Sequence, residues 1–258
     1  MEIDGRVAVV TGGASGMGAA LVALLRDAGV TTVAWDVTSG ADIECDVSDA
    51  AAVSRALAET VAAHGVPSIV TTCAAIGGGA TTLLDVDPVD WNRLFGVNVT
   101  GTWLVLRAAA RALVEHEMDG SLVAFSSISA RLSDRGMGPY CASKAAVDML
   151  VKVAASEWGR FGIRVNAIAP GVTETPMLGG AARIPGWIDA VSNRTPLGGI
   201  GAAGDVARAA LALHQLDWVT GESIAVDGGL RLHSPIDSFG AIETARAHHA
   251  ASPRDEAT

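Results

Sequence analysis

The chain of 258 residues is poor in several residue types, and each scarcity argues against a class of protein. It has one tyrosine, three cysteines with no CxxC pair, and a net charge of −10. Nucleic-acid binding needs a basic face, so this balance predicts no nucleic-acid partner. Three unpaired cysteines form no disulfide framework and predict reduced thiols in the cytoplasm. The six histidines lack ligand spacing, so we expect no metal site.

Charge is absent from residues 7–25, a stretch that could imitate a membrane span. The stretch contains four glycines, a threonine and a serine, and a strand, turn and helix describe it better. The N-terminus carries Glu2 and Asp4 where a signal peptide would be basic. We therefore expect no membrane partner and no signal peptide.

Hydrophobic residues make up 50% of the chain and charged residues 18%, which suits a sheet buried on both faces. Strand and helix patterns alternate, which predicts a single α/β domain with a Rossmann-like, doubly wound parallel sheet over residues 1–229. The predicted strands are 7–12, 31–36, 43–45, 68–74, 121–127, 163–169 and 222–227. The predicted helices are 16–28, 49–64, 88–115, 139–160, 176–193 and 203–215. Residues 230–258 form a C-terminal extension.

The single tyrosine, Tyr140, stands four residues before Lys144, one of only two lysines. Positions four apart share one face of a helix, so the phenol and the ammonium should lie close together. A nearby positive charge favours the phenolate, so we expect Lys144 to lower the pKa of Tyr140. The pair is a candidate acid or base. A half-buried tyrosine beside a solvated lysine is the alternative reading of these two residues alone.

A glycine-rich turn follows the first predicted strand and precedes the first predicted helix. It reads Thr11-Gly12-Gly13-Ala14-Ser15-Gly16-Met17-Gly18. Glycines allow the backbone to approach a pyrophosphate, and the N–H groups at a helix start favour its charge. The turn therefore predicts a dinucleotide site, against the alternative of an ordinary glycine-rich loop.

Asp36 ends the second predicted strand, 18 residues beyond Gly18. An acid near this spacing binds the 2′-hydroxyl of the adenosine ribose and repels a 2′-phosphate. No lysine or arginine lies in the glycine turn or directly after Asp36 to neutralise such a phosphate. The cofactor is therefore predicted to be NAD(H) rather than NADP(H).

Over almost its whole length the chain resembles the short-chain dehydrogenase/reductase family. The motifs lie in family order: the glycine turn, Asp46-Val47, Asn98-Val99-Thr100-Gly101, Ser127 placed 13 residues before Tyr140, Arg164 to Gly171 with Thr173 to Pro176, and Val226-Asp227-Gly228-Gly229. One segment departs from the family pattern. Thr72-Cys73-Ala74-Ala75 stands where the family usually has Asn-Asn-Ala-Gly, so the asparagine that braces the central sheet is missing.

The resemblance implies the catalytic set and its roles. Tyr140 is the acid/base for the substrate oxygen, Ser127 hydrogen-bonds the same oxygen, and Ser126 and Ser129 are less suitably spaced. Lys144 holds the nicotinamide ribose, and Asn98 fixes a water that relays protons from Lys144. The implied cofactor-binding residues are Gly12, Ser15, Gly16, Met17, Gly18, Asp36, Asp46, Val47, Ala74, Asn98, Tyr140, Lys144, Pro170, Gly171, Val172, Thr173 and Thr175.

The resemblance also places a substrate cap at about residues 175–194. The residues expected to line the substrate pocket are apolar: Ile76, Met137, Met177, Leu178 and Trp187. The favoured function is NAD-dependent interconversion of an apolar or cyclic secondary alcohol and its ketone. Reduction of a 3-oxoacyl-[acyl-carrier-protein] is the alternative, which Asp36 and the acidic composition disfavour. A cofactor-binding regulator without turnover is the third reading.

Similar proteins form homotetramers through the helix that carries the catalytic tyrosine and through the last strand. Here the predicted helix 139–160 is rich in alanine, which permits close approach of another helix. In the extension, we expect residues 230–239 to dock at a subunit interface near an active site and residues 240–251 to form a short helix.

Overall fold

The computed structural model describes residues 2–232, 239, 242–243 and 246. A seven-stranded parallel sheet forms its centre, with the strand order β3-β2-β1-β4-β5-β6-β9. The strands are β1 (Val7–Thr11), β2 (Thr31–Asp36), β3 (Ile43–Glu44), β4 (Ile69–Thr72), β5 (Gly120–Phe125), β6 (Ile163–Pro170) and β9 (Ser223–Val226). The order reverses direction between β1 and β4, which is where ligands bind in doubly wound sheets. The predicted Rossmann-like fold is confirmed.

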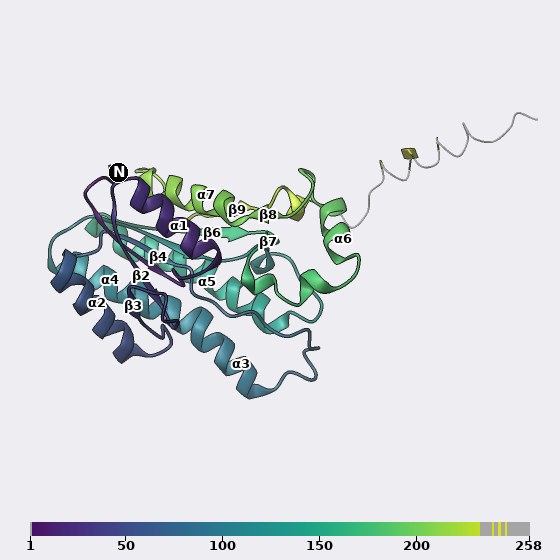
Figure 1. Ribbon diagram of the computed structural model, residues 1–258, viewed down its shortest axis with the longest axis horizontal. Helices are drawn as coiled ribbons and strands as arrows, with labels where there is room; N and C mark the ends of the chain where they lie inside the picture. The colour runs from purple at the N-terminus through teal and green to yellow at the C-terminus, as the bar shows by residue number, and fades with distance from the viewer. Residues whose placement is uncertain (1, 233–238, 240–241, 244–245, 247–258) are drawn as a thin grey trace, which may run out of the picture.

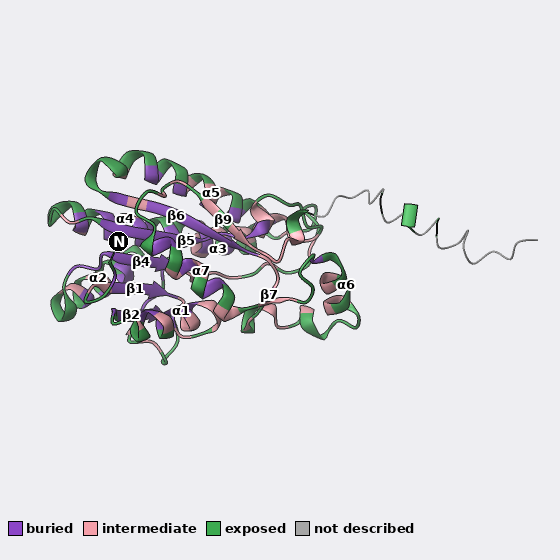
Figure 2. Ribbon diagram, turned by 90° about the horizontal axis from the view of Figure 1, so that it is seen from above, coloured by how far each residue is buried: buried purple, intermediate pink, exposed green. Residues whose placement is uncertain are grey.

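Helices cover both faces of the sheet, so its strands are buried between two apolar layers (Figures 1 and 2). One layer contains α2 (Ala50–His64), α4 (Thr102–Glu115) and α5 (Gly138–Trp158). The other contains α1 (Gly16–Asp27) and α7 (Ala203–Gln215), which pack against each other as well as on the sheet. Alternate residues of a strand serve alternate layers: Val70 joins the first core and Ile69 the second.

The predicted helix 88–115 is a helical segment with an irregular centre. It consists of α3 (Pro88–Phe95), a π-helical turn (Gly96–Gly101) and α4. Asp87 caps the start of α3 by accepting a hydrogen bond from the Val89 N–H at 2.7 Å. The π-turn widens the helix around Asn98, and such turns are frequent at functional sites.

The predicted helix 176–193 is wrong over its first half. The segment forms two 3₁₀ turns, Pro176–Leu178 and Ala181–Arg183, and only α6 (Trp187–Arg194) is α-helical. Gly179 and Gly186 have positive φ angles of 37° and 75°, which interrupt a helix. A second, two-stranded parallel sheet pairs β7 (Thr173–Glu174) with β8 (Gly201–Ala202), and the sequence patterns did not predict it.

The C-terminal extension lies largely outside the described residues, so its predicted docking and its predicted helix 240–251 stay predictions. Within the described part, Leu230–Leu232 forms a 3₁₀ turn and Leu232 is exposed. Among the described residues, no helix is both long enough and apolar enough to cross a membrane.

Candidate active site

The glycine turn between β1 and α1 is shaped by close backbone contacts. A Cβ on Gly12, whose φ is 65°, would lie 2.9 Å from the backbone of Ala74, and a Cβ on Gly18 would overlap the Gly12 carbonyl oxygen. The Ala74 N–H donates to Thr11 Oγ1 at 3.2 Å and fixes this approach. Only glycine fits at these two positions, and the backbone of the turn stays closely folded, as a pyrophosphate site requires. We call this turn the glycine cradle.

Asp36 lies against the same turn, as its place at the end of β2 predicts. Its carboxylate accepts hydrogen bonds from the Ala14 N–H and the Thr38 N–H, each at 3.2 Å. Just after β3, the Asp46 carboxylate accepts hydrogen bonds from the backbone N–H and the hydroxyl of Ser48. Val47 is buried against Gly101, where an added Cβ would lie 2.7 Å from a Val47 methyl carbon.

The segment after β6 returns to the glycine turn from the opposite side. A Cβ on Gly16 would lie 3.4 Å from Thr175, and a Cβ on Gly171 would lie 2.8 Å from Asp227. The Thr173 hydroxyl donates to the Gly171 carbonyl at 3.1 Å. The two halves of the predicted cofactor site thus meet between Gly16 and Thr175.

Ser127, Tyr140 and Lys144 come together at the carboxyl edge of β5. Ser127 is nearly buried and its hydroxyl accepts from the Ser129 N–H at 3.1 Å. The Ser127 side chain also lies close enough to the Tyr140 phenol to lower its pKa. Lys144 is buried, its Nζ donates to the Phe125 carbonyl at 2.8 Å, and Nζ lies 5.7 Å from the centre of the Tyr140 ring.

The pKa values differ from the sequence prediction. Burial raises the pKa of Tyr140, although the Ser127 hydrogen bond opposes this. Burial also lowers the pKa of Lys144 to about 8. The predicted lowering of the Tyr140 pKa is wrong for this structure, because desolvation of the phenol outweighs the interaction with Ser127, which lowers it. Tyr140 is therefore a protonated phenol at neutral pH.

Asn98 joins three parts of the site from the centre of the π-turn. Its Oδ1 accepts from the Ile76 N–H at 2.8 Å, and its Nδ2 donates to the Ile76 carbonyl at 3.0 Å and to Ser143 Oγ at 3.2 Å. The Ser143 hydroxyl in turn donates to the Tyr140 carbonyl at 2.8 Å. Sequence reasoning gave Ser143 no role, although its place directly before Lys144 was a usable signal.

Comparison with known proteins identifies the family of the chain. A family model described as enoyl-(acyl carrier protein) reductase matches residues 12–231. The chain belongs to the short-chain dehydrogenase/reductase family. Members of this oxidoreductase family bind a nicotinamide cofactor, and the cradle described above fits one.

Similar proteins in the short-chain dehydrogenase/reductase family match over nearly their full length. The human (3R)-3-hydroxyacyl-CoA dehydrogenase is 36% identical over 252 residues, which cover 87% of this chain and 95% of that protein. A short-chain dehydrogenase/reductase from Mycobacterium ulcerans is 31% identical with a TM-score of 0.85, covering 97% of this chain and 98% of that one. A gluconate 5-dehydrogenase from Burkholderia cenocepacia, solved with NADP and tartrate, is 31% identical with a TM-score of 0.85, covering 90% and 98%.

The departure at Thr72-Cys73 has a structural consequence within this family fold. Thr72 Oγ1 is a buried side-chain oxygen without a hydrogen-bond partner among the described residues. Cys73 follows it, and burial raises the pKa of its thiol to about 12, so the thiol is neutral. The bracing side chain is thus absent, as the sequence indicates, while the backbone of Ala74 still reaches the glycine turn.

The predicted substrate residues are brought together only in part. A Cβ added to Gly77 would lie 3.9 Å from Met177 Cγ, so the cap reaches the loop that begins after Ile76. A Cβ on Gly78 would lie 3.8 Å from Tyr140 Cβ, which places this loop beside the catalytic helix. Met137 is the residue before α5. Leu178 ends a 3₁₀ turn and Trp187 begins α6.

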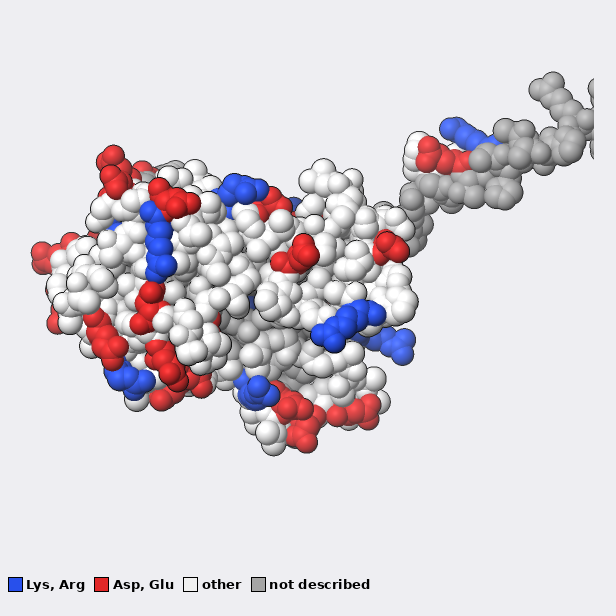
Figure 3. Space-filling view, viewed as in Figure 1, with Lys and Arg blue, Asp and Glu red and all other residues white. Residues whose placement is uncertain are grey.

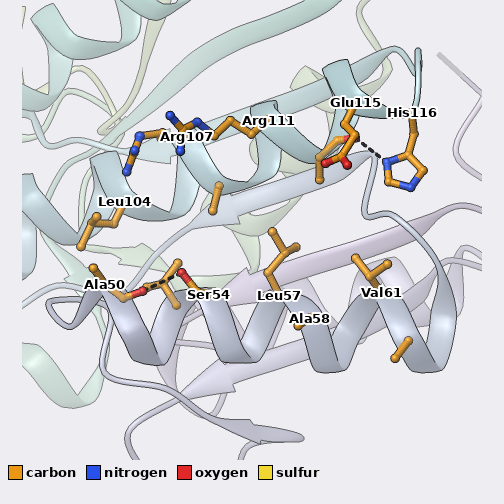
Figure 4. A pocket seen from close by; sticks show the side chains of 14 residues that line it. Ala50, Ser54, Leu57, Ala58, Val61, Leu104, Arg107, Arg111, Glu115 and His116 are labelled. Carbon is orange, nitrogen blue, oxygen red and sulfur yellow. Dashed lines mark hydrogen bonds between the residues drawn. The ribbon is translucent and has the colours of Figure 1, made fainter.

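A groove of about 520 Å³ lies elsewhere, between α2 and α4 (Figure 4). Its walls include Leu57 and Val61 on α2 and Arg107 and Arg111 on α4. None of the predicted site residues lines it. Among the described residues, no group of three or more metal-ligating side chains is placed to hold an ion.

Proposed function

We propose that the chain is an NAD(H)-dependent oxidoreductase that interconverts a secondary alcohol and a ketone. The observation that carries the proposal is the meeting of Ser127, Tyr140 and Lys144 at one edge of the sheet, beside the glycine cradle. Family membership supports an oxidoreductase. The intact catalytic set also argues against a regulator without turnover.

The cofactor would lie along the carboxyl edge of the sheet. The glycine turn, from Gly12 to Gly18, would hold the pyrophosphate, Asp36 the adenosine ribose, and Lys144 the nicotinamide ribose. Asp46 and Val47 would border the adenine, and residues 170–175 the nicotinamide. When bound, the nicotinamide supplies or accepts the hydride.

Tyr140 would transfer the proton that accompanies hydride transfer. Because burial keeps its pKa high, Tyr140 is protonated at neutral pH and is ready to donate to a ketone oxygen. Ser127, whose side chain lies beside the Tyr140 phenol, would donate to the same oxygen and stabilise the charge that develops there. Asn98 and Ser143 hold the Tyr140 backbone in place through Ser143 Oγ.

The preference for NAD over NADP rests on Asp36. Its carboxylate already accepts from the glycine turn, and a 2′-phosphate beside it would be repelled. The Burkholderia relative was solved with NADP, so the discrimination has to be measured on this chain. We expect kcat/KM for NAD to exceed that for NADP by at least about tenfold, roughly 1.4 kcal/mol, and Asp36→Ala to narrow the gap. Equal use of both cofactors by the wild-type protein would contradict this part of the proposal.

The substrate class has two candidates. The exposed apolar residues Leu83, Met177 and Ile184 favour an uncharged, apolar or cyclic alcohol. The relatives named (3R)-3-hydroxyacyl-CoA dehydrogenase favour a 3-hydroxyacyl thioester. Reduction of a 3-oxoacyl group on an acyl carrier protein ranks below both, because carrier proteins are acidic and this chain has a net charge of −10 (acidic side chains are prominent in Figure 3).

We also propose that the chain forms a homotetramer and that it works in the cytoplasm. Met149 and Val153 on α5 are exposed, and so are Trp103 and Val114 on the neighbouring α4. Such apolar residues on two adjacent helices suit a helix-to-helix interface with another copy. The three described cysteines are free, which suits a reducing compartment.

A substrate screen tests the proposal. Alcohols, ketones and 3-hydroxyacyl-CoA esters are offered with NAD or NADH, and turnover is followed by the absorbance of the reduced nicotinamide. We expect turnover with at least one secondary alcohol or ketone, and its loss in Tyr140→Phe. If the best turnover persists in Tyr140→Phe, the proposed site is not the site of reaction.

A further inference from the structure

The loop that leads from β4 to α3 contains three consecutive glycines, Gly77, Gly78 and Gly79. A Cβ added to Gly78 would lie 3.8 Å from Tyr140 Cβ, and a Cβ added to Gly77 would lie 3.9 Å from Met177 Cγ. These two glycines therefore present bare backbone between the catalytic helix α5 and the cap.

Neither the backbone nor the packing of the chain requires glycine at these three positions. None of the three has a positive φ angle, so alanine can adopt each conformation. The closest atom to any of the three added Cβ atoms is Leu94 Cδ1, at 3.4 Å from that of Gly78, which is an ordinary van der Waals distance. Glycine at these sites only adds freedom to the unfolded chain, which disfavours folding.

Two glycines nearby do have a reason within the fold. Gly136 has a φ of 88°, and a Cβ on Gly138, at the start of α5, would overlap the Leu83 side chain. Gly77 and Gly78 have neither reason, although they border the same helix. A glycine without a conformational or packing reason is typical of a place where a ligand approaches the backbone closely.

The loop is fixed at both ends, so the glycines do not serve as a hinge. Asn98 binds both backbone groups of Ile76, accepting from the N–H at 2.8 Å and donating to the carbonyl at 3.0 Å. The Thr81 N–H donates to the Gly136 carbonyl at 3.1 Å. The bare backbone between Ile76 and Thr81 thus keeps a defined place beside Tyr140.

The surroundings of this backbone are apolar and open to solvent. The nearest atoms to the added Cβ atoms of Gly77 and Gly78 are carbon atoms of Met177, Leu94 and Tyr140. Gly77 is exposed and Gly78 is half-buried. A charged group placed here would lose hydration without gaining a partner, so the space suits an uncharged group.

We propose that Gly78 is a specificity-determining residue, because its missing side chain leaves room beside Tyr140 for a branched or cyclic, uncharged substituent on the substrate carbon that bears the reacting oxygen. This inference rests on the proposed function, in which Tyr140 transfers a proton to that oxygen. It also chooses between the two substrate classes considered there. A straight-chain 3-hydroxyacyl thioester is unbranched on both sides of its carbinol carbon and does not need this room, whereas an alcohol attached to a ring does.

A pair of ketones with the same number of carbon atoms tests the proposal. Cyclohexyl methyl ketone carries a ring on the carbonyl carbon, and 2-octanone carries a straight chain. Their apolar surfaces are similar, so they differ mainly in width beside the carbonyl. We define the ring selectivity as kcat/KM for the ring ketone divided by kcat/KM for 2-octanone, both with NADH. The wild-type protein should prefer the ring ketone, and a preference for 2-octanone would overturn the proposal.

Alanine at Gly78 should lower the ring selectivity by at least about fivefold, because its methyl group occupies the space beside Tyr140 and overpacks the site when the ring is bound. Gly79→Ala is the matched control in the same loop. Its Cβ would meet only Thr81 Oγ1, at 3.7 Å, so the ring selectivity should stay near the wild-type value. An unchanged ring selectivity in Gly78→Ala would overturn the proposal. An equal fall in Gly79→Ala would do the same, since loop flexibility would then explain both.

Thermal unfolding checks the premise that the fold does not need this glycine. Gly78→Ala should unfold at a temperature no lower than the wild type, because alanine restricts the unfolded chain without straining the folded one. Failure to fold, or a clearly lower unfolding temperature, would show that the fold itself requires Gly78 and would overturn the proposal.

Binding of the two ketones to the protein with NAD gives a readout that needs no turnover, because NAD has no hydride to donate. In calorimetric titrations, Gly78→Ala should weaken the binding of the ring ketone more than that of 2-octanone. Failure of the proposed function is seen separately, as turnover that survives Tyr140→Phe. Loss of turnover in Tyr140→Phe together with an unchanged ring selectivity in Gly78→Ala would reject this inference alone.

Discussion

The proposed cofactor site and the cap at residues 175–194 are held in place by different means. On the cofactor side, Gly12 and Gly18 leave no space for a side chain, and Asn98 makes three hydrogen bonds to its surroundings. The cap consists of two 3₁₀ turns and the short helix α6, and Met177 and Ile184 are more than half exposed. The region of Gly12, Gly18 and Asn98, here called the floor, is therefore fixed by packing, whereas the cap is loosely packed, as expected where one fold serves many substrates.

Among matched pairs of variants, we expect the largest difference in kcat for two nearby serines, Ser127 and Ser129. Ser127→Ala removes the hydroxyl that would stabilise charge on the substrate oxygen, so kcat should fall by roughly 10²–10³-fold. Ser129→Ala, two residues away, is the matched control and should have a mild effect. Measured kcat values that fall equally in both variants would mean that the whole segment, rather than Ser127, supports catalysis.

Alanine substitutions at two glycines, Gly12 and Gly180, compare the packing of the floor with that of the cap. Gly12→Ala places a Cβ 2.9 Å from the Ala74 backbone at a φ of 65°, so it should cost about 1–3 kcal/mol of unfolding free energy and weaken NADH binding. Gly180→Ala in the cap meets nothing within 4 Å and has a φ of −66°, so it should change little. Denaturant unfolding and NADH titration of both variants check this contrast.

The central sheet should also respond to acid, through a buried histidine that contacts β4 and β5. His214 is fully buried, with Nε2 2.9 Å from Thr71 Oγ1 and Nδ1 3.0 Å from Ser121 Oγ, and burial lowers its pKa from 6.5 to about 3. A folded pKa below the unfolded one means that its contribution is complete above pH 6.5 and is lost as the pH falls toward 3.

This histidine alone predicts a loss of about 1.4 kcal/mol per pH unit below 6.5. His214→Gln should have a flatter dependence of unfolding free energy on pH between 6.5 and 4. The same slope in wild type and variant would show that other groups govern the acid response.

The smallest effects are expected in the cap. Met177→Ala removes an apolar side chain that reaches the Gly77 loop, so it should raise KM for an apolar substrate several-fold, about 1 kcal/mol, with little change in kcat. Trp187→Ala, at the start of α6, should raise KM less. A larger effect of Trp187→Ala would mean that the cap closes over the substrate.

Sequence patterns predicted the local structure of the floor well because its residues are largely contiguous. The strand, glycine turn and helix from β1 to α1 follow from contiguous residues, and so does the spacing of Tyr140 and Lys144 on one helix. The π-turn at Asn98 was not predicted, because it depends on hydrogen bonds to Ile76 and Ser143, which are distant in sequence.

Other misses have equally physical causes. The pairing of His214 with Thr71 and Ser121 joins α7 to two strands and leaves no local pattern. The direction of the Tyr140 pKa shift depends on burial, which residue spacing does not give. In the cap, Gly179 and Gly186 indicate an interrupted helix, which the predicted helix 176–193 does not take into account.

The most direct test of the account is Tyr140→Phe, which removes one oxygen and leaves the ring that packs beside Lys144. We predict that turnover falls by roughly 10²–10⁴-fold, while the affinity for NADH, measured by nicotinamide fluorescence, stays within about threefold of the wild type. Near-wild-type turnover in Tyr140→Phe would contradict the central claim that this phenol, held between Ser127 and Lys144, transfers the proton.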